Sequence, residues 1–392
     1  MGNIFSDRIS DVPKSFIREI LKVAVDPEVI SFAGGLPNRD LFPVEGIRQA
    51  SNAVLDLAPG DSLQYASSEG YRPLREWIAQ RYREKRGLDI PVDNIVITSG
   101  SQQALDLLAK VILNKGDGVA IEEPGYLGAI QAFSVYQPEF HPVPVYNSGP
   151  EKNHLQKILN REKTKLFYCV PNFQNPSGIT YTTKVRKSTA EVISSTEALL
   201  IEDDPYGELR FLGEEKPSFF QLVPEQTVLL GSFSKIFVPG FRIGWIACRD
   251  DILDKVITAK QASDLHTNIF SQRVLYQYLK LNNIDDHIAV IKNAYGNQRQ
   301  AMVNAIREHF PPEADYTMPE GGMFLWVTLP KGIDTMDVFH NAIKQKVAFV
   351  PGIPFFTRDK GRNTMRLNYS CTPEKEIESG IARLSKVIKE ML

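Results

Sequence analysis

Lys235 is the residue whose surroundings first point to chemistry. It ends the segment Gly-Ser-Phe-Ser-Lys, which follows the apolar run at residues 228–230. A lysine amine can form a Schiff base with an aldehyde, and the hydroxyls of Ser232 and Ser234 can donate hydrogen bonds to an anion next to it. Arg242 adds a planar, permanently charged group that suits phosphate. These four residues predict a site for a ligand that carries a phosphate and an aldehyde.

Four other polar clusters follow short apolar runs in the same way. Each run has the pattern of a buried strand, and each cluster contains residues that favour turns. The clusters occupy residues 99–103, 122–126, 171–178 and 202–206. Ligands of open α/β sheets bind at the carboxyl ends of the strands, so we expect all five clusters to form one polar site.

The residue types narrow the ligand further. Ser101 and Gln102 begin a helix-length segment, and the backbone N–H groups and dipole at a helix start favour an anion. Asp203 could pair with a pyridinium nitrogen, and Tyr126 could stack on a flat ring. The nucleotide motifs G-x-x-x-x-G-K-[ST] and G-x-G-x-x-G do not occur in the chain. Phosphate, aldehyde, pyridinium and ring together describe pyridoxal 5′-phosphate, PLP.

Residues 231–245, GSFSKIFVPGFRIGW, resemble the PLP-lysine segment of class I aminotransferases, which have fold type I. Asn-Pro-Ser-Gly at 175–178 and Asp-Asp-Pro-Tyr at 203–206 match two further family segments in the expected order. Segments that resemble the 2-aminoadipate and kynurenine aminotransferase branch occupy residues 31–38, 64–66 and 364–370. The resemblance covers about residues 14–390.

The resemblance implies a role for each matched residue. Lys235 would bind the aldehyde of PLP and then carry a proton, while Asp203 would keep the pyridine nitrogen protonated. Tyr206 and Asn175 would hydrogen-bond the ring hydroxyl, and Tyr126 would stack on the ring. Lys235, Asp203 and Tyr206 are the expected catalytic residues. The implied phosphate ligands are Gly100, Ser101, Gln102, Ser232, Ser234 and Arg242, joined by Tyr65 from the neighbouring subunit. A homodimer with shared active sites follows.

The substrate residues are also implied by the resemblance. Arg366 would grip the α-carboxylate of the substrate, and Gly35 and Leu36, with Asn175, would line its pocket. A short amphipathic helix is expected at residues 13–27, over that pocket. Its Arg18 could pair with the distal carboxylate of glutamate or 2-aminoadipate; the alternative is an ordinary solvated charge.

The order of apolar and amphipathic segments predicts an α/β fold. Strands are expected at residues 95–97, 119–121, 166–170, 198–201, 228–230 and 243–247, with helices at 71–86, 102–113 and 182–195. Alternation of buried strands with helices is typical of a mainly parallel sheet flanked by helices. The resemblance makes this the PLP-dependent transferase fold type I, with a seven-stranded type of sheet.

A smaller α+β domain is expected after this sheet. Its elements are a long helix at 284–310, a strand at 323–329, a helix at 335–345, strands near 347 and 365 and a helix from 373. The expected division is therefore an N-terminal segment at 1–45, which packs on the small domain and the partner, a large PLP-binding domain at 46–285 and the small domain at 286–392.

Composition excludes several other classes. The chain has 45 Lys and Arg against 47 Asp and Glu, which disfavours nucleic acid or an anionic membrane as the main partner. Its three widely spaced cysteines argue against a disulfide framework and for the cytoplasm, and its six histidines show no metal-like clustering. The longest charge-free run, at 166–183, contains Pro and Asn residues that prevent it from spanning a bilayer. The first residues lack the apolar stretch of a secretory signal.

Three alternative functions compete with an aminotransferase. Ser232-x-x-Lys235 fits the serine β-lactamase pattern, but the S-D-N and K-T-G segments of those enzymes are missing. A regulator that fuses a DNA-binding domain to an aminotransferase-like sensor would need more chain before residue 31. A PLP-dependent lyase or decarboxylase on the same fold stays open, because the reaction depends on which bond of the α-carbon lies perpendicular to the ring. We expect an aminotransferase that uses 2-aminoadipate, aromatic or branched-chain donors and 2-oxoglutarate, with ping-pong kinetics.

Overall fold

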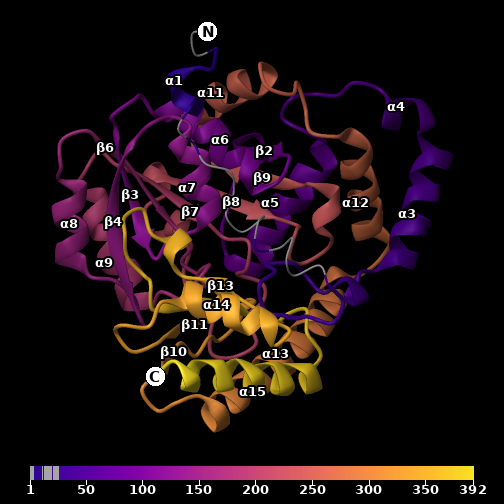
Figure 1. Cartoon of the computed structure of the whole chain (residues 1–392). Helices are drawn as coiled ribbons and strands as arrows, with labels where there is room; N and C mark the ends of the chain where they lie inside the picture. The colour runs from indigo at the N-terminus through magenta and orange to yellow at the C-terminus, as the bar shows by residue number, and fades with distance from the viewer. Residues whose placement is uncertain (1–3, 11, 13–19, 21–25) are drawn as a thin grey trace.

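A mixed sheet runs through the larger part of the molecule (Figure 1). The computed structural model describes residues 4–10, 12, 20 and 26–392. Within these residues, eight strands form this sheet in the order β2-β9-β8-β7-β6-β3-β4-β5. Their bounds are β2 Ile95–Thr98, β3 Gly118–Glu123, β4 Glu139–Tyr146, β5 Gly149–Pro150, β6 Thr164–Cys169, β7 Leu199–Asp203, β8 Thr227–Ser232 and β9 Gly244–Ala247.

The strand directions confirm the expected mainly parallel α/β arrangement. β8, β7, β6, β3 and β4 run parallel to one another, whereas β9 is antiparallel to both of its neighbours. Every residue of β2, β3, β8 and β9 is buried, which explains why their sequences are mostly apolar or small residues without alternation; the exceptions are the buried Glu122 and Glu123 at the end of β3.

The sequence patterns miss β4 and β5. β4 contains Pro142 and Pro144, and proline is rare in strands because it has no N–H to donate. In the described structure β5 pairs only with Val145 and Tyr146 and adds two residues at the edge. The prolines therefore lie where β4 has no neighbour on its outer side, and the sheet has one short strand more than the seven-stranded type.

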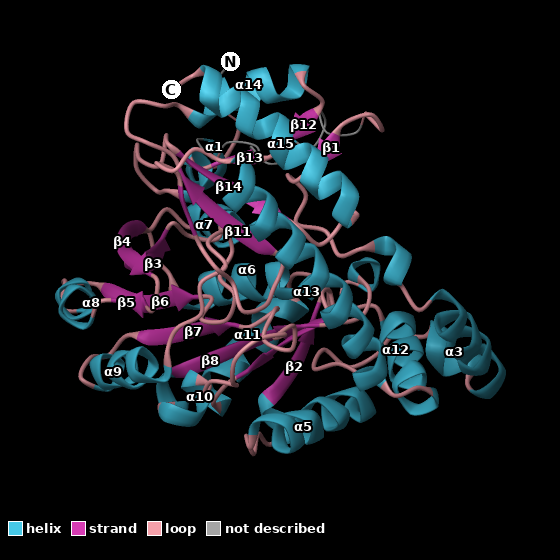
Figure 2. Cartoon of the chain, turned by 90° about the horizontal axis from the view of Figure 1, so that it is seen from below, coloured by secondary structure: helices cyan, strands magenta, loops and turns pink. Residues whose placement is uncertain are grey.

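Helices cover both faces of this sheet. Figure 2 shows α5, α9 and α10 below the strands and α6 and α7 above them. The helices of this part are α3 Val44–Leu57, α4 Pro59–Leu63, α5 Arg72–Arg86, α6 Ser101–Ile112, α7 Leu127–Ser134, α8 Lys152–Leu159, α9 Thr183–Ser194, α10 Phe219–Leu222, α11 Asp250–Gln261 and α12 Ile269–Leu281. α5 ends at Gly87, whose φ of 63° closes the helix in the left-handed conformation that glycine adopts readily.

The C-terminal part has its own sheet, in the order β10-β11-β14-β13. Its elements are α13 Ile284–His309, β10 Asp315–Tyr316, β11 Phe324–Thr328, α14 Thr335–Lys344, β12 Val347–Ala348, β13 Val350–Pro351, β14 Thr364–Asn368 and α15 Glu374–Glu390. The helices and strands expected here are confirmed, and β10 and β13 are additional. β1 (Ile30–Ser31) pairs with β12, so the segment after residue 26 lies on this part. The domain boundaries after residues 45 and 285 stay a prediction.

Membrane insertion through a helix finds no support in the described residues. None of their helices is long and apolar enough to cross a bilayer.

Candidate active site

The polar clusters after the strands meet at one cavity of about 520 Å³. Segments from both sheets and from the N-terminal region contribute to it. Its lining is Gly35, Leu36, Pro37, Ser101, Gln102, Tyr126, Val170, Asn175, Asp203, Pro205, Tyr206, Ser232, Ser234, Lys235, Pro239, Arg242 and Arg366. Most of the residues predicted from the sequence thus lie around a single space, although they are spread over more than 300 positions of the chain.

Lys235 extends into this cavity from the turn after β8. Its Nζ donates a hydrogen bond of 2.8 Å to the carbonyl oxygen of Gly35. Burial, with the nearby guanidinium of Arg366, lowers the pKa of the Lys235 amine to about 8. At a given pH near neutrality, a larger fraction of this amine is therefore neutral than in an exposed lysine. The neutral amine is the form that can act as a base or nucleophile.

Asp203 ends β7 and is 2% exposed. Its Oδ2 accepts a hydrogen bond of 2.8 Å from the hydroxyl of Tyr168 on β6, while its Oδ1 has no hydrogen-bond partner among the described residues. Burial raises the pKa of the Asp203 carboxyl to about 7, despite the hydrogen bond from Tyr168. A buried oxygen without a partner costs free energy unless a ligand supplies a donor or a positive charge.

Arg366 lies in the middle of β14 and is almost fully buried. Its Nη1 donates to Oδ1 of Asn175 at 3.0 Å and its Nη2 donates to the carbonyl of Ala33 at 2.8 Å. The guanidinium carbon lies 4.4 Å from the centre of the Phe324 ring. The Nε atom has no partner among the described residues. Burial lowers the pKa of Arg366 to about 10, so the group stays charged at neutral pH and can receive an anion.

Asn175 connects Arg366 to the tyrosine at the other side of the cavity. Its Nδ2 donates to the hydroxyl of Tyr206 at 3.3 Å. Desolvation raises the pKa of the Tyr206 hydroxyl above its usual range, which keeps it neutral. A neutral hydroxyl and an amide N–H can both donate to one oxygen of a ligand.

Anion donors collect at the start of α6. Ser101 is the first residue of that helix, and its hydroxyl has no partner in the described structure. Gly100 precedes it with a φ of 78°, and a Cβ there would lie 2.5 Å from Nη2 of Arg242. Only glycine allows the loop to approach Arg242 this closely. Arg242 also donates to the carbonyl of Ser99 at 3.2 Å, and Ser232 accepts from the backbone N–H of Ser234 at 3.0 Å.

These positions suggest a match with enzymes of known family. The family model for aminotransferase class I and II matches residues 27–384. The chain belongs to this family. The aromatic-amino-acid aminotransferase 1 of Thermococcus litoralis is 43% identical over 392 residues, which cover 98% of this chain and 94% of that protein.

Two solved aminotransferases match the whole fold. A Pyrococcus horikoshii kynurenine aminotransferase, crystallised with PMP, is 42% identical, with a TM-score of 0.95 over 99% of this chain and 98% of its own. An α-aminoadipate aminotransferase from Thermus thermophilus, complexed with N-(5′-phosphopyridoxyl)-L-leucine, is 38% identical, with a TM-score of 0.92 over 99% of this chain and 97% of its own. The fold type I expectation is therefore confirmed, and the protein is a PLP-dependent aminotransferase that acts on an amino acid and a 2-oxo acid.

The residues of the aminotransferase cavity fit PLP. The unpartnered Oδ1 of Asp203 suits a protonated ring nitrogen, and the unpartnered hydroxyl of Ser101 suits a phosphate oxygen. Tyr126, whose pKa burial raises to about 12, offers its neutral ring to a flat ligand. When bound, PLP supplies an electron sink that stabilises negative charge at the substrate α-carbon.

Two described residues of the prediction, Gly100 and Tyr65, do not line this cavity. Tyr65 is 79% exposed and packs edge-on against the His266 ring, with ring centres 5.9 Å apart. Its role toward a partner subunit stays a prediction. Arg18 lies outside the described residues, so its place near the substrate is also untested.

Sequence reasoning missed two contributors. Tyr168 holds Asp203, but it sits inside a buried strand, where tyrosine usually indicates core packing. The carbonyl of Gly35 holds Lys235, and a backbone acceptor has no signature in the residue types. The one signal for the Tyr168–Asp203 contact is the presence of a tyrosine in an otherwise apolar strand, β6, which neighbours the strand that ends at Asp203.

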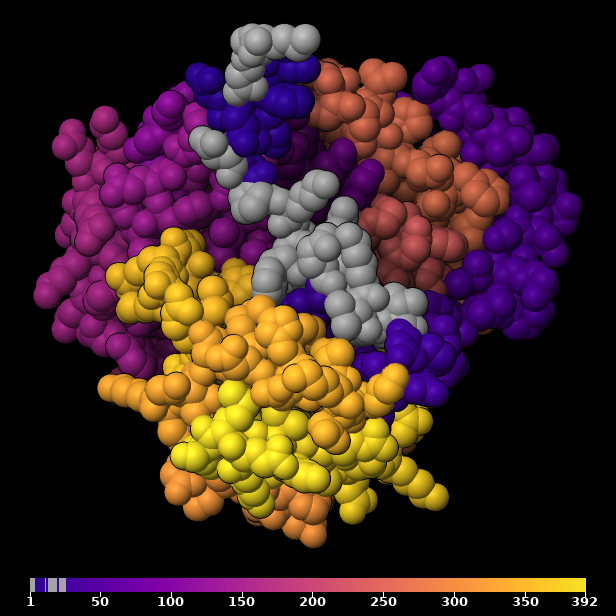
Figure 3. Space-filling view, viewed as in Figure 1, coloured from indigo at the N-terminus to yellow at the C-terminus, as the bar shows by residue number. Residues whose placement is uncertain are grey.

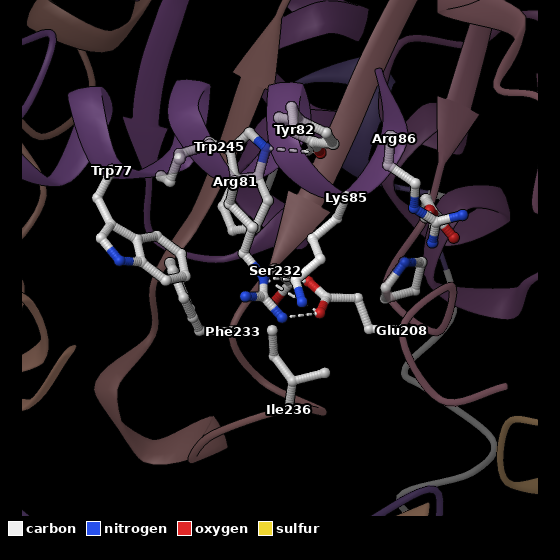
Figure 4. A pocket seen from close by; sticks show the side chains of 13 residues that line it. Trp77, Arg81, Tyr82, Lys85, Arg86, Glu208, Ser232, Phe233, Ile236 and Trp245 are labelled. Carbon is white, nitrogen blue, oxygen red and sulfur yellow. Dashed lines mark hydrogen bonds and ion pairs between the residues drawn. The ribbon is translucent and has the colours of Figure 1, made fainter. Parts of the chain in front are cut away.

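A second, more apolar pocket lies next to the cavity and shares Pro205 and Ser232 with it. Figure 4 shows Arg81 of α5 between the Trp77 ring and Glu208. At about 40 Å³ this pocket has room for only a few waters. We interpret it as the packing of α5 against the turn that carries Lys235.

Proposed function

We propose that this aminotransferase transfers the amino group of an aromatic, branched-chain or 2-aminoadipate donor to 2-oxoglutarate, in a ping-pong cycle. The observation that carries the proposal is the buried Arg366, which leaves Nε without a partner among the described residues in the same cavity as Lys235. A carboxylate bound there fixes one end of an amino acid, and Lys235 is then available to the rest of it.

The proposed roles follow from the contacts. Arg366, held by Asn175 and Ala33, binds the substrate α-carboxylate, and Lys235 takes the proton of the α-carbon. Asp203 stabilises the ring nitrogen of the cofactor, while Ser101 and the other donors at the start of α6 bind its phosphate. The amino donor and the acceptor 2-oxo acid would use the same cavity in turn. The 2-oxo acid formed from the donor would therefore have to leave before the acceptor binds, which gives ping-pong kinetics.

A panel of amino donors with 2-oxoglutarate tests this function. 2-Aminoadipate, leucine, phenylalanine and kynurenine would be compared by kcat/KM, and the 2-oxo acid product and free ammonia would be followed together. Transamination gives the 2-oxo acid without ammonia and parallel lines in double-reciprocal plots. Ammonia or carbon dioxide in step with substrate loss would instead favour the lyase or decarboxylase, and no turnover with any donor would favour a sensor.

We also propose a cytoplasmic homodimer with shared active sites. All three cysteines are free, which is compatible with a reducing compartment. Leu57, Leu63, Tyr65 and Leu265 are large hydrophobic side chains that this chain leaves exposed. α3 and α4, drawn in indigo at the outer edge of Figure 3, carry two of them. Exposed apolar groups of this kind mark association surfaces when they are grouped.

Tyr65→Phe should weaken PLP binding by about 1.5–3 kcal/mol, roughly 10–100-fold in Kd, because one hydrogen bond to the charged phosphate is lost. The cofactor retained after dialysis would be measured by absorbance. Tyr146→Phe, which changes an exposed tyrosine of β4 outside the cavity, is the matched control. A protein that sediments as a monomer and still binds PLP fully would contradict the shared site.

Arg18→Ala should lower kcat/KM for 2-aminoadipate by roughly 10–100-fold, equivalent to about 1.5–3 kcal/mol, if a desolvated ion pair with the distal carboxylate is lost. Leucine lacks that carboxylate, so its kcat/KM should hardly change. Equal losses for the two substrates would mean that Arg18 only supports the local structure.

A further inference from the structure

Lys260, in the last turn of α11, is a completely buried lysine. Its Nζ donates to Oδ1 of Asp264 at 2.8 Å, to Oγ1 of Thr267 at 2.9 Å and to Oε1 of Gln103 at 3.2 Å. Three acceptors thus satisfy the three N–H groups of the ammonium. Burying a charged group costs free energy, even when partners compensate for part of the cost. We therefore looked for a function of Lys260 in the residues that it contacts.

The partners of Lys260 lead directly to the loop before α6. Oε1 of Gln103, which accepts from Lys260, also accepts from the backbone N–H of Ser99 at 2.7 Å. Nε2 of Gln103 donates to Oδ2 of Asp264 at 2.6 Å, which closes a ring of contacts around the ammonium. Gln103 therefore transmits the position of Lys260 to Ser99.

Ser99 in turn fixes the anion donors on the other side of the loop. Its carbonyl accepts from Nη2 of Arg242, and the next two residues are Gly100 and Ser101, where α6 begins. If Ser99 shifts, the orientation of Arg242 and the direction of the first N–H groups of α6 change together. Both are groups that a phosphate needs at fixed positions.

We propose that Lys260 is a positioning residue for the cofactor phosphate, acting through Gln103 and Ser99. The inference rests on the proposed assignment of Ser101 and Arg242 to that phosphate. Lys260 does not line the cavity, so it acts without touching the ligand. It also neutralises Asp264, whose carboxylate would otherwise place an uncompensated negative charge beside residues 99–101. We call these residues, which lead into α6, the phosphate loop.

The same contacts reach the residue proposed to serve the partner subunit. Thr267, the third acceptor of Lys260, follows His266, and the His266 ring packs against Tyr65. Thr267 also donates to the carbonyl of Ile97 on β2, just before the phosphate loop. Lys260 therefore holds the loop of its own site and the neighbourhood of Tyr65 in one fixed arrangement.

Comparison of PLP with pyridoxal, which lacks the phosphate, tests the proposal. Lys260→Met keeps a long apolar side chain but removes the ammonium. Titration of the cofactor-free full chain, followed by visible absorbance, would give Kd for each ligand. We expect PLP to bind about 10–100-fold more weakly than to wild type, the range for lost hydrogen bonds to a charged group, and pyridoxal to bind equally well. A general loss of packing would weaken the binding of PLP and of pyridoxal to the same extent.

Two further variants make the outcome decisive. Gln103→Met removes the shorter link from Lys260 to Ser99 while the ammonium stays, and leaves only the 3.5 Å hydrogen bond that Oγ of Ser99 donates to Oδ2 of Asp264. It should give the same selective loss for PLP, and it also serves if Lys260→Met does not fold. Lys110→Met is the control, since Lys110 is an exposed neighbour that donates to Ser263 at 2.8 Å and should affect neither ligand. Equal losses for PLP and pyridoxal, or no loss, in both Lys260→Met and Gln103→Met would overturn the proposal.

Arg242→Met separates this inference from the proposed function. Selective loss of PLP binding in Arg242→Met, without it in the Lys260 and Gln103 variants, would leave the phosphate assignment intact and refute the role of Lys260. If Arg242→Met shows no selective loss, the phosphate assignment itself is wrong, and the role proposed for Lys260 fails with it.

Discussion

Lys235→Ala should stop turnover and remove the visible absorbance band of the holoenzyme. The amine is the group proposed to move the proton of the substrate α-carbon, and such general acid–base roles are worth about 10²–10⁴-fold in rate. Loss of the covalent attachment point adds to this. Because the pKa of Lys235 is lowered to about 8, the wild-type amine is partly neutral at mildly alkaline pH, and no other described lysine lines the cavity.

Borohydride reduction followed by peptide mapping checks the Lys235 prediction. In wild type the added mass should lie on the peptide that contains Lys235, and the variant should carry none. Lys110→Arg is the companion variant, because it alters an exposed lysine that lies outside the cavity, and it should keep both the absorbance band and the adduct on Lys235. A reduced adduct on another lysine of the wild-type protein would show that Lys235 is not the attachment point.

The large sheet was largely predictable because its strands are buried on both faces. β2, β6, β7 and β8 appear in the sequence as short apolar runs, and the polar residues that follow them mark the carboxyl ends. β4 could not be predicted in this way, because its two prolines and partial exposure resemble a loop. Edge strands depend on neighbours rather than on their own pattern, so single-sequence reasoning loses them first.

The gathering of the cavity residues was predictable, but their contacts were not. Motif order located Asn175 and Arg366 separately, whereas the hydrogen bond between them joins positions 191 residues apart. The Gly35–Lys235 contact uses a backbone carbonyl, and the Lys260–Gln103–Ser99 chain uses ordinary polar residues without a motif. Such contacts depend on tertiary geometry, which residue types and spacing do not contain. The role of Tyr65 depends on a second chain, so neither the sequence pattern nor the fold of one chain determines it.

Asp203→Asn should lower kcat by about 10²–10³-fold, the usual effect of removing one preorganised electrostatic contact. Asparagine keeps the shape and can still accept from Tyr168, but it cannot carry the negative charge that a protonated ring nitrogen requires. Single-turnover rates with one amino donor would measure the loss directly. Tyr168→Phe, which removes the hydrogen bond but keeps the carboxylate, should have a much smaller effect; an equal loss would assign the role to the Tyr168–Asp203 pair instead.

Asp203→Asn should stabilise the cofactor-free protein, although it lowers the kcat of the holoenzyme. Asp203 keeps its proton in the folded state up to about pH 7, whereas an unfolded chain releases it near pH ~4. The folded state therefore binds more protons in this interval, and the carboxyl progressively destabilises the protein as pH rises from about 4 to 7, with the full cost above about pH 7. The amide of the Asp203→Asn variant would carry no such cost. Cofactor-free Asp203→Asn should therefore gain Tm relative to cofactor-free wild type between about pH 4 and 7 and keep that gain at about pH 8. A Tm difference that is independent of pH would mean that Asp203 is already paired in the cofactor-free protein, and that its free oxygen does not await a positive charge.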